Sequence, residues 1–481
     1  RICLSRVPMK KIILLHSAVA VPVLFLFWLL AYRNTLWWME GMSFFSTLPD
    51  FAVLQARLPS GLLEYVASYL LQFYHSAVAG ALLQTLYGWI VMVCADVVVW
   101  RVVRRASLSW ISFIPVGIFV SLQCRYNDGV GSMVWALAAI AAAMVAVCVT
   151  RRPEHYDTGL DRRSLLRIVT VPLVLLVAGG AVSLSILENR VRERLYRVER
   201  LAEDKDWDRI LEIVSPEVSA EDPVRRRYAL LALAENGQLG EKFLRYGVKG
   251  SDDFFFAGSA DFVGCNFNAL LARSLGLDNE VIHQSFQLNS LSPLGYSFRS
   301  MRRITDAFLR EGNTVLAEKY MRILLHSTCH KSWVESRVPR MISLLESPEQ
   351  HEEDNILTCA TSDEPLLMDM ACLWDARPDN RMCADILLCG LLASRQMDKF
   401  AMLFSRIYAS AYSDSDVLPR YYEEALLVLA RQNPDILKRY SFSSFRTEAF
   451  DKFAALMDAG RYDDARAAYP DSFWSYLYAA M

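Results

Sequence analysis

The sequence lacks the short motifs by which common enzyme classes are recognised. It contains no GxxxxGK[ST] phosphate loop, no GxGxxG after a strand, no HExxH zinc-protease helix and no GxSxG nucleophile turn. A sustained alternation of apolar and polar residues, typical of strands, is missing from residue 188 onward. The sequence therefore predicts no cofactor, names no reaction and favours an all-α fold.

A large charge of either sign is also missing, since the formal net charge is only −2. This balance hides an asymmetry. Residues 1–187 carry 15 Lys and Arg against 8 Asp and Glu, whereas residues 188–481 carry the other 36 against 45. A nucleic-acid binder needs a basic face on its soluble part. The acidic second half therefore argues against nucleic acid as a partner.

Long apolar runs are abundant, and the mean hydropathy is +0.20. A helix crosses a bilayer with about 20 mostly apolar residues. Five runs meet this requirement, near residues 12–32, 77–100, 106–124, 129–149 and 168–187. The first lacks a small-residue cleavage site, so we interpret it as an uncleaved anchor. The sequence thus predicts a transmembrane domain over residues 1–187 that contacts the lipid bilayer directly.

Lys and Arg residues predict the orientation of these spans, because they concentrate in cytoplasmic loops. Twelve of them lie before residue 12, between residues 100 and 106, and in the 151–167 loop, against three in the alternate loops. We expect a bacterial inner-membrane protein with a cytoplasmic N-terminus and a periplasmic domain over residues 188–481. The apolar segment 60–74 carries Glu64 and Gln72 and is short, so it predicts an interfacial helix. If that segment spanned instead, the topology would reverse.

Weak internal similarity points to helical repeats in residues 188–481. Small or polar turns recur before amphipathic helices, as in KDWDRILEIV, NGQLGEKFLRY, EGNTVLAEKYMRIL, SRQMDKFAMLF and AGRYDDARAAYP. Gly237, Gly312 and Gly460 are 75 and 148 residues apart, about two and four units of roughly 37. Ala317 and Ala465 each follow a turn glycine by five residues. The pattern predicts a soluble α-solenoid like tetratricopeptide repeats, with an irregular helical bundle as the alternative.

With this order of parts, the chain resembles an uncharacterised Bacteroidota membrane family, a domain of unknown function with a polytopic N-terminal region and a tetratricopeptide-like helical domain. The matching stretches are LPSGLLEYVASYLLQFY, NGQLGEKFLRYGVKGSD, LREGNTVLAEKYMRILLHSTCHKSW, RYYEEALL and YPDSFWSYLYAA. The resemblance brings no established activity. A fainter similarity to polytopic glycosyltransferases that use lipid-linked sugars rests on an acid in the first outer loop, here Glu40. Those enzymes have about twice as many spans.

The first outer loop holds the candidate catalytic residues Glu40, Glu64 and His75. An acid–base or metal-dependent enzyme needs two or more such groups converging at a shielded point. No sequence spacing enforces convergence here, and solvated loop acids at the interface are the favoured interpretation. The neighbouring Trp37 and Trp38 are expected to anchor the helix end at the lipid headgroups.

Two further groups are candidates for chemistry. Asp96 lies inside an apolar span, where an ionisable residue is a functional candidate. We expect an ion pair with Arg101 or Arg104, and a proton or ion relay is the alternative. The sequence HSTCH places His326, Cys329 and His330 at helical spacing, but a closed zinc site needs four ligands. They are weak metal candidates, and no metal site and no particular disulfide is predicted.

Three hypotheses about function follow. The leading one is a membrane-anchored periplasmic scaffold whose repeat domain binds an envelope protein or peptide, because solenoids offer extended binding surfaces. This interpretation leans against an enzyme, and the sequence leaves open whether any catalysis occurs. The alternative is a membrane enzyme or lipid-handling protein that acts on a lipid-linked glycan through the outer loop 33–75. A transport subunit is the third option, supported by Asp96 alone.

Overall fold

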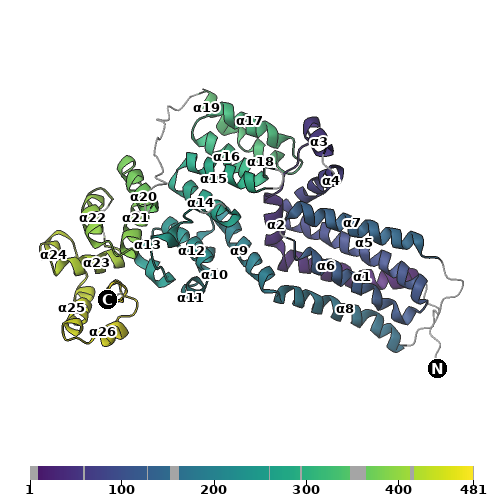
Figure 1. The fold of residues 1–481 in the computed structure, drawn as a ribbon, viewed down its shortest axis with the longest axis horizontal. Helices are drawn as coiled ribbons and strands as arrows, with labels where there is room; N and C mark the ends of the chain where they lie inside the picture. The colour runs from purple at the N-terminus through teal and green to yellow at the C-terminus, as the bar shows by residue number, and fades with distance from the viewer. Residues whose placement is uncertain are drawn as a thin grey trace. The chain divides into compact units, whose positions relative to one another are not determined.

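The structure is a computed structural model that describes residues 9–57, 60–126, 128–151, 162–258, 261–292, 295–346, 365–411 and 417–479. Within these ranges all regular elements are helices and no strand is formed. The predicted all-α fold class is therefore confirmed. Figure 1 shows the helices in chain order.

Five helical segments of the described chain are long and apolar enough to cross a membrane. They are α1 (Met9–Ala31), α5 (Ala77–Val103), the stretch formed by η2 (Ala106–Ser112) and α6 (Phe113–Gln123), α7 (Gly129–Val149), and residues Leu166–Ser185 of α8 (Arg162–Ser185). These segments correspond to the five apolar runs expected from the sequence. Each is a helix because a chain in lipid must satisfy its backbone hydrogen bonds internally.

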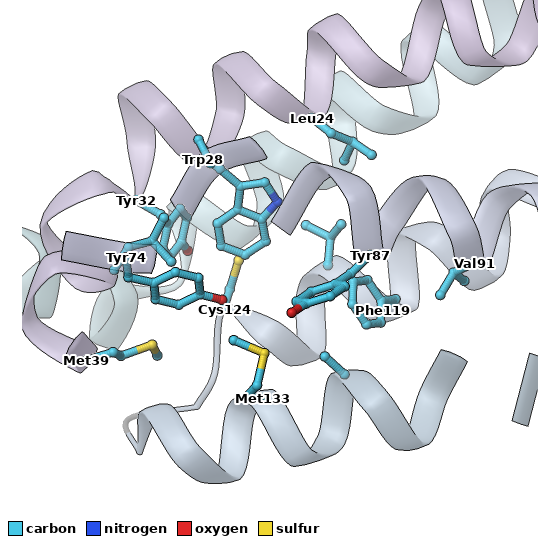
Figure 2. Close-up of a cluster of buried hydrophobic side chains, with 14 of the residues drawn as sticks. Leu24, Trp28, Tyr32, Met39, Tyr74, Tyr87, Val91, Phe119, Cys124 and Met133 are labelled. Atoms are coloured by element: carbon cyan, nitrogen blue, oxygen red, sulfur yellow. The ribbon is translucent and has the colours of Figure 1, made fainter. Parts of the chain in front are cut away.

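Helix α5 is the central helix of this bundle. It packs against α1, α6 and α7, while α8 packs against α1 and α6 (Figure 1). Buried apolar and aromatic side chains fill the space between these helices. Figure 2 shows a part of this core, with the side chains of Trp28, Tyr32, Tyr74, Tyr87 and Met133 between the helices.

Four short helices connect α1 to α5: α2 (Arg33–Gly41), α3 (Pro49–Ala56), α4 (Gly61–Leu71) and η1 (Gln72–His75). Helix α4 has 11 residues, which is well below the ~20 that a span requires. It packs against α3 and α7. The segment 60–74 is therefore helical as α4 and η1, and its expected position in the membrane interface stays a prediction.

The chain divides into two compact units. The membrane unit comprises residues 1–197 together with 288–349, and the C-terminal unit comprises residues 198–287 together with 350–481. Residues 288–349 belong to the expected repeat domain by sequence, yet they form one compact unit with residues 1–197. Their helices are α16 (Phe298–Arg310), α17 (Thr314–Leu325), α18 (Lys331–Glu335) and α19 (Val338–Glu346).

The C-terminal unit is built from short helices. In chain order the helices after α8, apart from α16–α19, are α9 (Leu187–Glu203), α10 (Trp207–Ile213), α11 (Pro216–Glu221), α12 (Pro223–Glu235), α13 (Leu239–Lys242), η3 (Phe243–Tyr246), η4 (Ser251–Phe254), α14 (Phe262–Leu275), α15 (Asp278–Leu291), α20 (Pro365–Ala376), α21 (Arg381–Ala393), α22 (Met397–Ala411), α23 (Arg420–Ala430), α24 (Ile436–Arg439), α25 (Ser444–Asp458), α26 (Tyr462–Ala468) and α27 (Phe473–Tyr478). Helices α9 and α15 contain the points at which the two units divide.

One type of turn recurs between helices. Six described residues with positive φ end a helix in this way: Lys205, Gly237, Gly276, Gly312, Arg395 and Gly460. At each of them the N–H of the next residue donates to the carbonyl five positions earlier, at N···O distances of 2.7 to 2.9 Å. This is the Schellman arrangement, which satisfies a free carbonyl at the helix end. The first four turns are 32, 39 and 36 residues apart.

A buried residue follows most of these turns at a fixed distance. Five positions after the turn residue lie Ile210, Val281, Ala317, Phe400 and Ala465, all 0% exposed. After Gly237 the corresponding residue is Lys242, which is half-buried. The glycine and alanine spacing noted in the sequence is thus one case of a broader helix–turn–helix unit.

Candidate functional site

Three segments that are far apart in the sequence converge within the membrane unit. Glu40 lies in the last turn of α2, which follows α1 with only Tyr32 between them. His75 is the last residue of η1 and lies two residues before α5 begins. His330 is the N-cap residue of α18. We call Glu40, His75 and His330 the acid–histidine cluster.

The geometry of the cluster is tight. Oε1 of Glu40 lies 2.5 Å from Nε2 of His330, and Oε2 of Glu40 lies 4.0 Å from Nδ1 of His75. One potential ligand atom from each residue lies within 4.8 Å of those from the other two. The side chains of Glu40 and His330 are 3% and 0% exposed, whereas that of His75 is 47% exposed. A buried pair therefore stands behind one accessible imidazole.

Glu193 of α9 fixes the helix that carries Glu40. Its carboxylate accepts four hydrogen bonds at the start of α2, from the backbone N–H and the side chain of both Asn34 and Thr35, at 2.6 to 3.1 Å. The N-terminus of a helix has free N–H groups and a partial positive charge, so a carboxylate stabilises it. Glu193 thus sets the position of α2, and with it that of Glu40.

The segment 326–330 is held against the first outer segment by polar contacts. Gln72 Oε1 accepts from the backbone N–H of Thr328 at 2.8 Å, and the carbonyl of His326 accepts from the N–H of Thr47 at 2.8 Å. The N–H of Phe298 also donates to the carbonyl of Ser43, which links α16 to the loop after α2. These bonds bring His330 to Glu40 across 290 residues of sequence.

Aromatic packing fixes the plane of the His330 ring. The ring stacks on Phe298 with the centroids 3.9 Å apart. Phe298 belongs to a buried cluster with Phe44, Phe51 and Val334. The Nδ1 atom of His330 is buried and has no hydrogen-bond partner among the residues that the structure describes.

Electrostatics set the charge states of the two groups that face each other. Burial favours the neutral form of Glu40, but the charge and hydrogen bond of His330, with the charges of His75 and Arg302, together outweigh it, so the pKa of Glu40 lies below its ordinary value. For His75, burial lowers the pKa, and the nearby Glu40 carboxylate opposes this effect without cancelling it. At neutral pH the cluster therefore presents a carboxylate and a neutral, accessible imidazole.

Two arginines of α16 lie near α2 or the cluster. Arg302 acts on both Glu40 and His75, because its positive charge lowers the pKa of each. Arg299 lies over the ring of Trp37 at 4.3 Å, and its guanidinium is close to Gly41. The carboxylate thus stands in a positive surrounding.

The structure separates the other outer-loop candidates from the cluster. Glu64 lies on α4 and accepts a hydrogen bond from Ser60. It does not belong to the group of side chains around Glu40 whose ligand atoms lie within 4.8 Å of one another. His326 is exposed. Cys329 is near enough to Glu40 for the carboxylate to add to the rise that burial causes in its thiol pKa. The HSTCH segment is a turn between α17 and α18, so the expected helical spacing is wrong and only His330 joins the cluster.

The expected partners of Asp96 are wrong. Asp96 accepts a hydrogen bond from Nδ1 of His16 on α1, at 2.8 Å, and both side chains are buried. Arg101 instead donates to the carbonyl of Thr150 at 2.8 Å. Residues five apart in a helix are about 140° apart around its axis, so Arg101 points away from Asp96.

The tryptophan pair also differs from its expected role. Trp38 is 9% exposed, and its ring stacks on Tyr196 of α9 with centroids 4.5 Å apart. Trp37 is covered by Arg299. Both rings therefore have partners within the membrane unit, where the sequence had predicted contact with lipid headgroups.

Sequence reasoning missed the residues that assemble the site. In the sequence, Gln72 is only a polar residue within an apolar segment. Glu193 of α9 and Arg302 of α16 each lie among several other charged residues, so the sequence does not distinguish them. A polar residue in an otherwise apolar stretch does indicate a specific partner, because a buried polar group needs one. Gln72 was in that sense detectable, although its partner was not.

Comparison with known proteins gives a family and no activity. No curated protein matches the chain, and no solved structure matches it. A sequence model of one family matches residues 9–188 and 182–480, which together include the whole acid–histidine cluster and both units. The chain thus belongs to the family of unknown function DUF6057.

Proposed function

We propose that this protein is a membrane enzyme whose active site is the acid–histidine cluster and whose substrate is carried in the lipid bilayer. The observation that carries the proposal is the convergence of Glu40, His75 and His330 within 4.8 Å. Their distance in sequence rules out local helix spacing as the cause of that convergence.

Burial supports a functional interpretation of Glu40. Removing a carboxylate from water is costly unless it is paired, so solvated loop acids do not adopt this arrangement without a reason. Groups with perturbed pKa in a partly closed site are frequent at active sites. The pKa values of Glu40 and His75 are both shifted in this way, and the exposed side chain of His75 makes the cluster accessible to solvent.

The place of the cluster in the chain supports a membrane-borne substrate. Glu40 and His75 lie on the short helices that directly follow α1 and directly precede α5. A site at these helix ends meets the headgroup region of a bilayer. The chemistry that the groups offer is removal of a proton from water or a hydroxyl during hydrolysis or group transfer. A lipid-linked glycan fits this description.

The proposal includes an orientation. The Lys and Arg distribution favours a cytoplasmic N-terminus in a bacterial inner membrane, which places the cluster and the C-terminal unit on the periplasmic side.

The test compares cells that lack the protein with cells that produce it at normal level. We expect membrane lipid extracts analysed by mass spectrometry to show one lipid-linked compound accumulating without the protein. Wild type and Glu64→Gln should remove the accumulation, because Glu64 lies outside the cluster, whereas Glu40→Gln and His330→Asn should not. Wild-type lipid profiles for both cluster variants would refute the enzyme.

A second function is favoured by the repeated turn. We propose that the helix–turn–helix units form a tetratricopeptide-like array that binds an envelope protein or peptide. The support is the same Schellman turn at six described positions, with a fully buried residue five positions later in five of them. Stacked helix pairs of this kind produce extended binding surfaces.

Crosslinking in cells tests this second proposal. Photoreactive residues at exposed positions of the C-terminal unit, such as Arg406 and Tyr462, should capture one recurrent protein. Positions on α7 that are exposed in the bundle, such as Val145, serve as the control and should capture lipid only. The same set of abundant proteins from all positions would contradict the scaffold.

A further inference from the structure

We infer that the acid–histidine cluster binds one divalent transition-metal ion of the zinc class through Glu40, His75 and His330. This inference deepens the function proposed above and rests on it for the role of the site, but metal binding is measurable without any activity. The starting observation is that the three residues each offer one ligand atom within 4.8 Å of the others.

The donor set selects the class of metal. Imidazole nitrogen and carboxylate oxygen suit zinc and its neighbours, whereas calcium and magnesium prefer oxygen ligands alone. Two histidines with one glutamate provide three protein ligands and leave a fourth position open, which is the pattern of catalytic zinc sites.

The distances require only small movements of side chains. Zinc–ligand bonds are about 2.0–2.2 Å, so two ligands of one tetrahedral ion lie roughly 3.3–3.5 Å apart. The Glu40–His330 contact of 2.5 Å must therefore open by about 1 Å, and the Glu40–His75 contact of 4.0 Å must close by about half that. His75 is half exposed and free of tight packing on one side. Its ring can therefore make the smaller of the two adjustments, and the larger one falls to the Glu40 carboxylate and His330.

The pairing of Glu40 with His330 is compatible with metal binding. A contact of 2.5 Å between Oε1 of Glu40 and Nε2 of His330 requires a proton between them, and an ion would take the place of that proton. Metal binding commonly releases protons from its ligands in this way. Nδ1 of His330 has no partner in the described part of the chain, so no hydrogen bond holds the ring in one tautomer against this exchange.

Access and shielding are divided among the three ligands. Glu40 and His330 are buried, so they hold the ion away from bulk water, while His75 lies at the opening. The fourth position therefore faces the side from which water or substrate enters. A metal ion there lowers the pKa of bound water and supplies a nucleophile at neutral pH.

The test uses the full-length protein purified in detergent, stripped with a chelator and then titrated with Zn²⁺ or Co²⁺. We expect one ion per chain by elemental analysis for wild type, and a visible Co²⁺ absorption typical of nitrogen and oxygen ligands. His75→Ala should bind about 100-fold more weakly or worse. His326→Ala, an exposed histidine outside the cluster, should bind like wild type. Glu40→Gln should show no Co²⁺ absorption.

Several results would overturn the inference. The inference is wrong if wild type binds far less than one ion per chain at saturating Zn²⁺. It is also wrong if wild type and His75→Ala bind the ion equally well. Because His75 is exposed, circular dichroism should show that His75→Ala is folded, and Zn²⁺ should raise the melting temperature of wild type alone. A shared rise in both proteins counts against the site.

The metal inference and the enzyme proposal fail separately. If wild type takes up no metal but Glu40→Gln still loses the lipid phenotype, the inference is wrong and the enzyme stands. If His75→Ala loses the metal and keeps a wild-type lipid profile, the metal site stands and the enzyme is wrong.

Discussion

Single residues decide whether the acid–histidine cluster exists, and Glu193 is one that lies outside it. Its carboxylate is the acceptor for four donors at the start of α2. Without it those N–H and hydroxyl groups lose their partner in a half-buried place, which costs about 1–3 kcal/mol. The last turn of the same helix carries Glu40. A change at Glu193 therefore affects both stability and the site.

The first prediction concerns Glu193→Ala. We expect the free energy of unfolding in detergent to fall by about 2 kcal/mol, with a weaker effect for Glu193→Gln, which keeps one acceptor oxygen. Glu188→Ala is the matched control because Glu188 is an exposed acid on the same helix, and it should change stability by less than about 0.5 kcal/mol. Equal losses for the two alanine variants would contradict the positioning role.

The sequence identified each member of the cluster as a candidate but did not predict that the three lie close together. Glu40 and His75 were candidates in the outer loop, and His330 was a candidate in a separate histidine and cysteine group. Only the fold relates them, because the contact between Glu40 and His330 crosses 290 residues. No periodicity encodes such a contact. The same limit applies to Asp96, whose partner His16 lies 80 residues away.

At the scale of the element, the Schellman turns allow a test of backbone strain. Lys205 and Arg395 occupy positive φ, at 58° and 56°, where glycine stands in the other four described turns. A side chain in this left-handed region costs roughly 1 kcal/mol because Cβ approaches the following carbonyl. The two residues are thus sites of local strain within a repeated unit.

The second prediction follows from these turns. Lys205→Gly and Arg395→Gly should each raise the free energy of unfolding by up to about 1 kcal/mol, whereas Gly460→Ala should lower it by about 1 kcal/mol. A Cβ at Gly460 would meet no described atom within 4 Å, so any loss there comes from φ and not from a clash. Chemical denaturation of the full chain measures all three. Lys205→Ala, which keeps a Cβ, is the control and should gain nothing.

Helices α1 and α5 are joined by the buried pair of His16 and Asp96. Ionisable groups within a membrane bundle are costly unless they are paired. The third prediction is that His16→Leu destabilises the bundle by about 3 kcal/mol, because it leaves Asp96 alone. The double variant His16→Leu/Asp96→Leu should recover most of that loss. Unfolding in mixed detergent micelles measures these values, and additive losses in the double variant would show that the pair contributes little.

At the scale of the whole molecule, the apolar runs and the all-α class were predictable because each depends on local composition. The division into units was not. Residues 288–349 share the helix–turn–helix pattern of the C-terminal unit through Gly312 and Ala317, yet they belong to the membrane unit. Among the residues that hold them there are Gln72 and Thr47, whose side chains bond to the 326–328 backbone. Their effect depends on distant partners that a single sequence does not reveal.

The last prediction concerns topology and follows from the Glu40–His330 contact. Two residues that share a hydrogen bond lie on the same side of a membrane, so an even number of spans must separate them. Four of the described candidate spans lie between them, namely α5, the η2–α6 stretch, α7 and α8. If α4 with η1 also crossed, the number would be five and the contact could not form.

We therefore expect an epitope tag inserted after Arg57 and a tag at the C-terminus to be accessible to antibody from the same side of the membrane. A tag at the N-terminus should be accessible only from the other side. Accessibility of the Arg57 and C-terminal tags from opposite sides would exclude the acid–histidine cluster, and with it both the enzyme and the metal site.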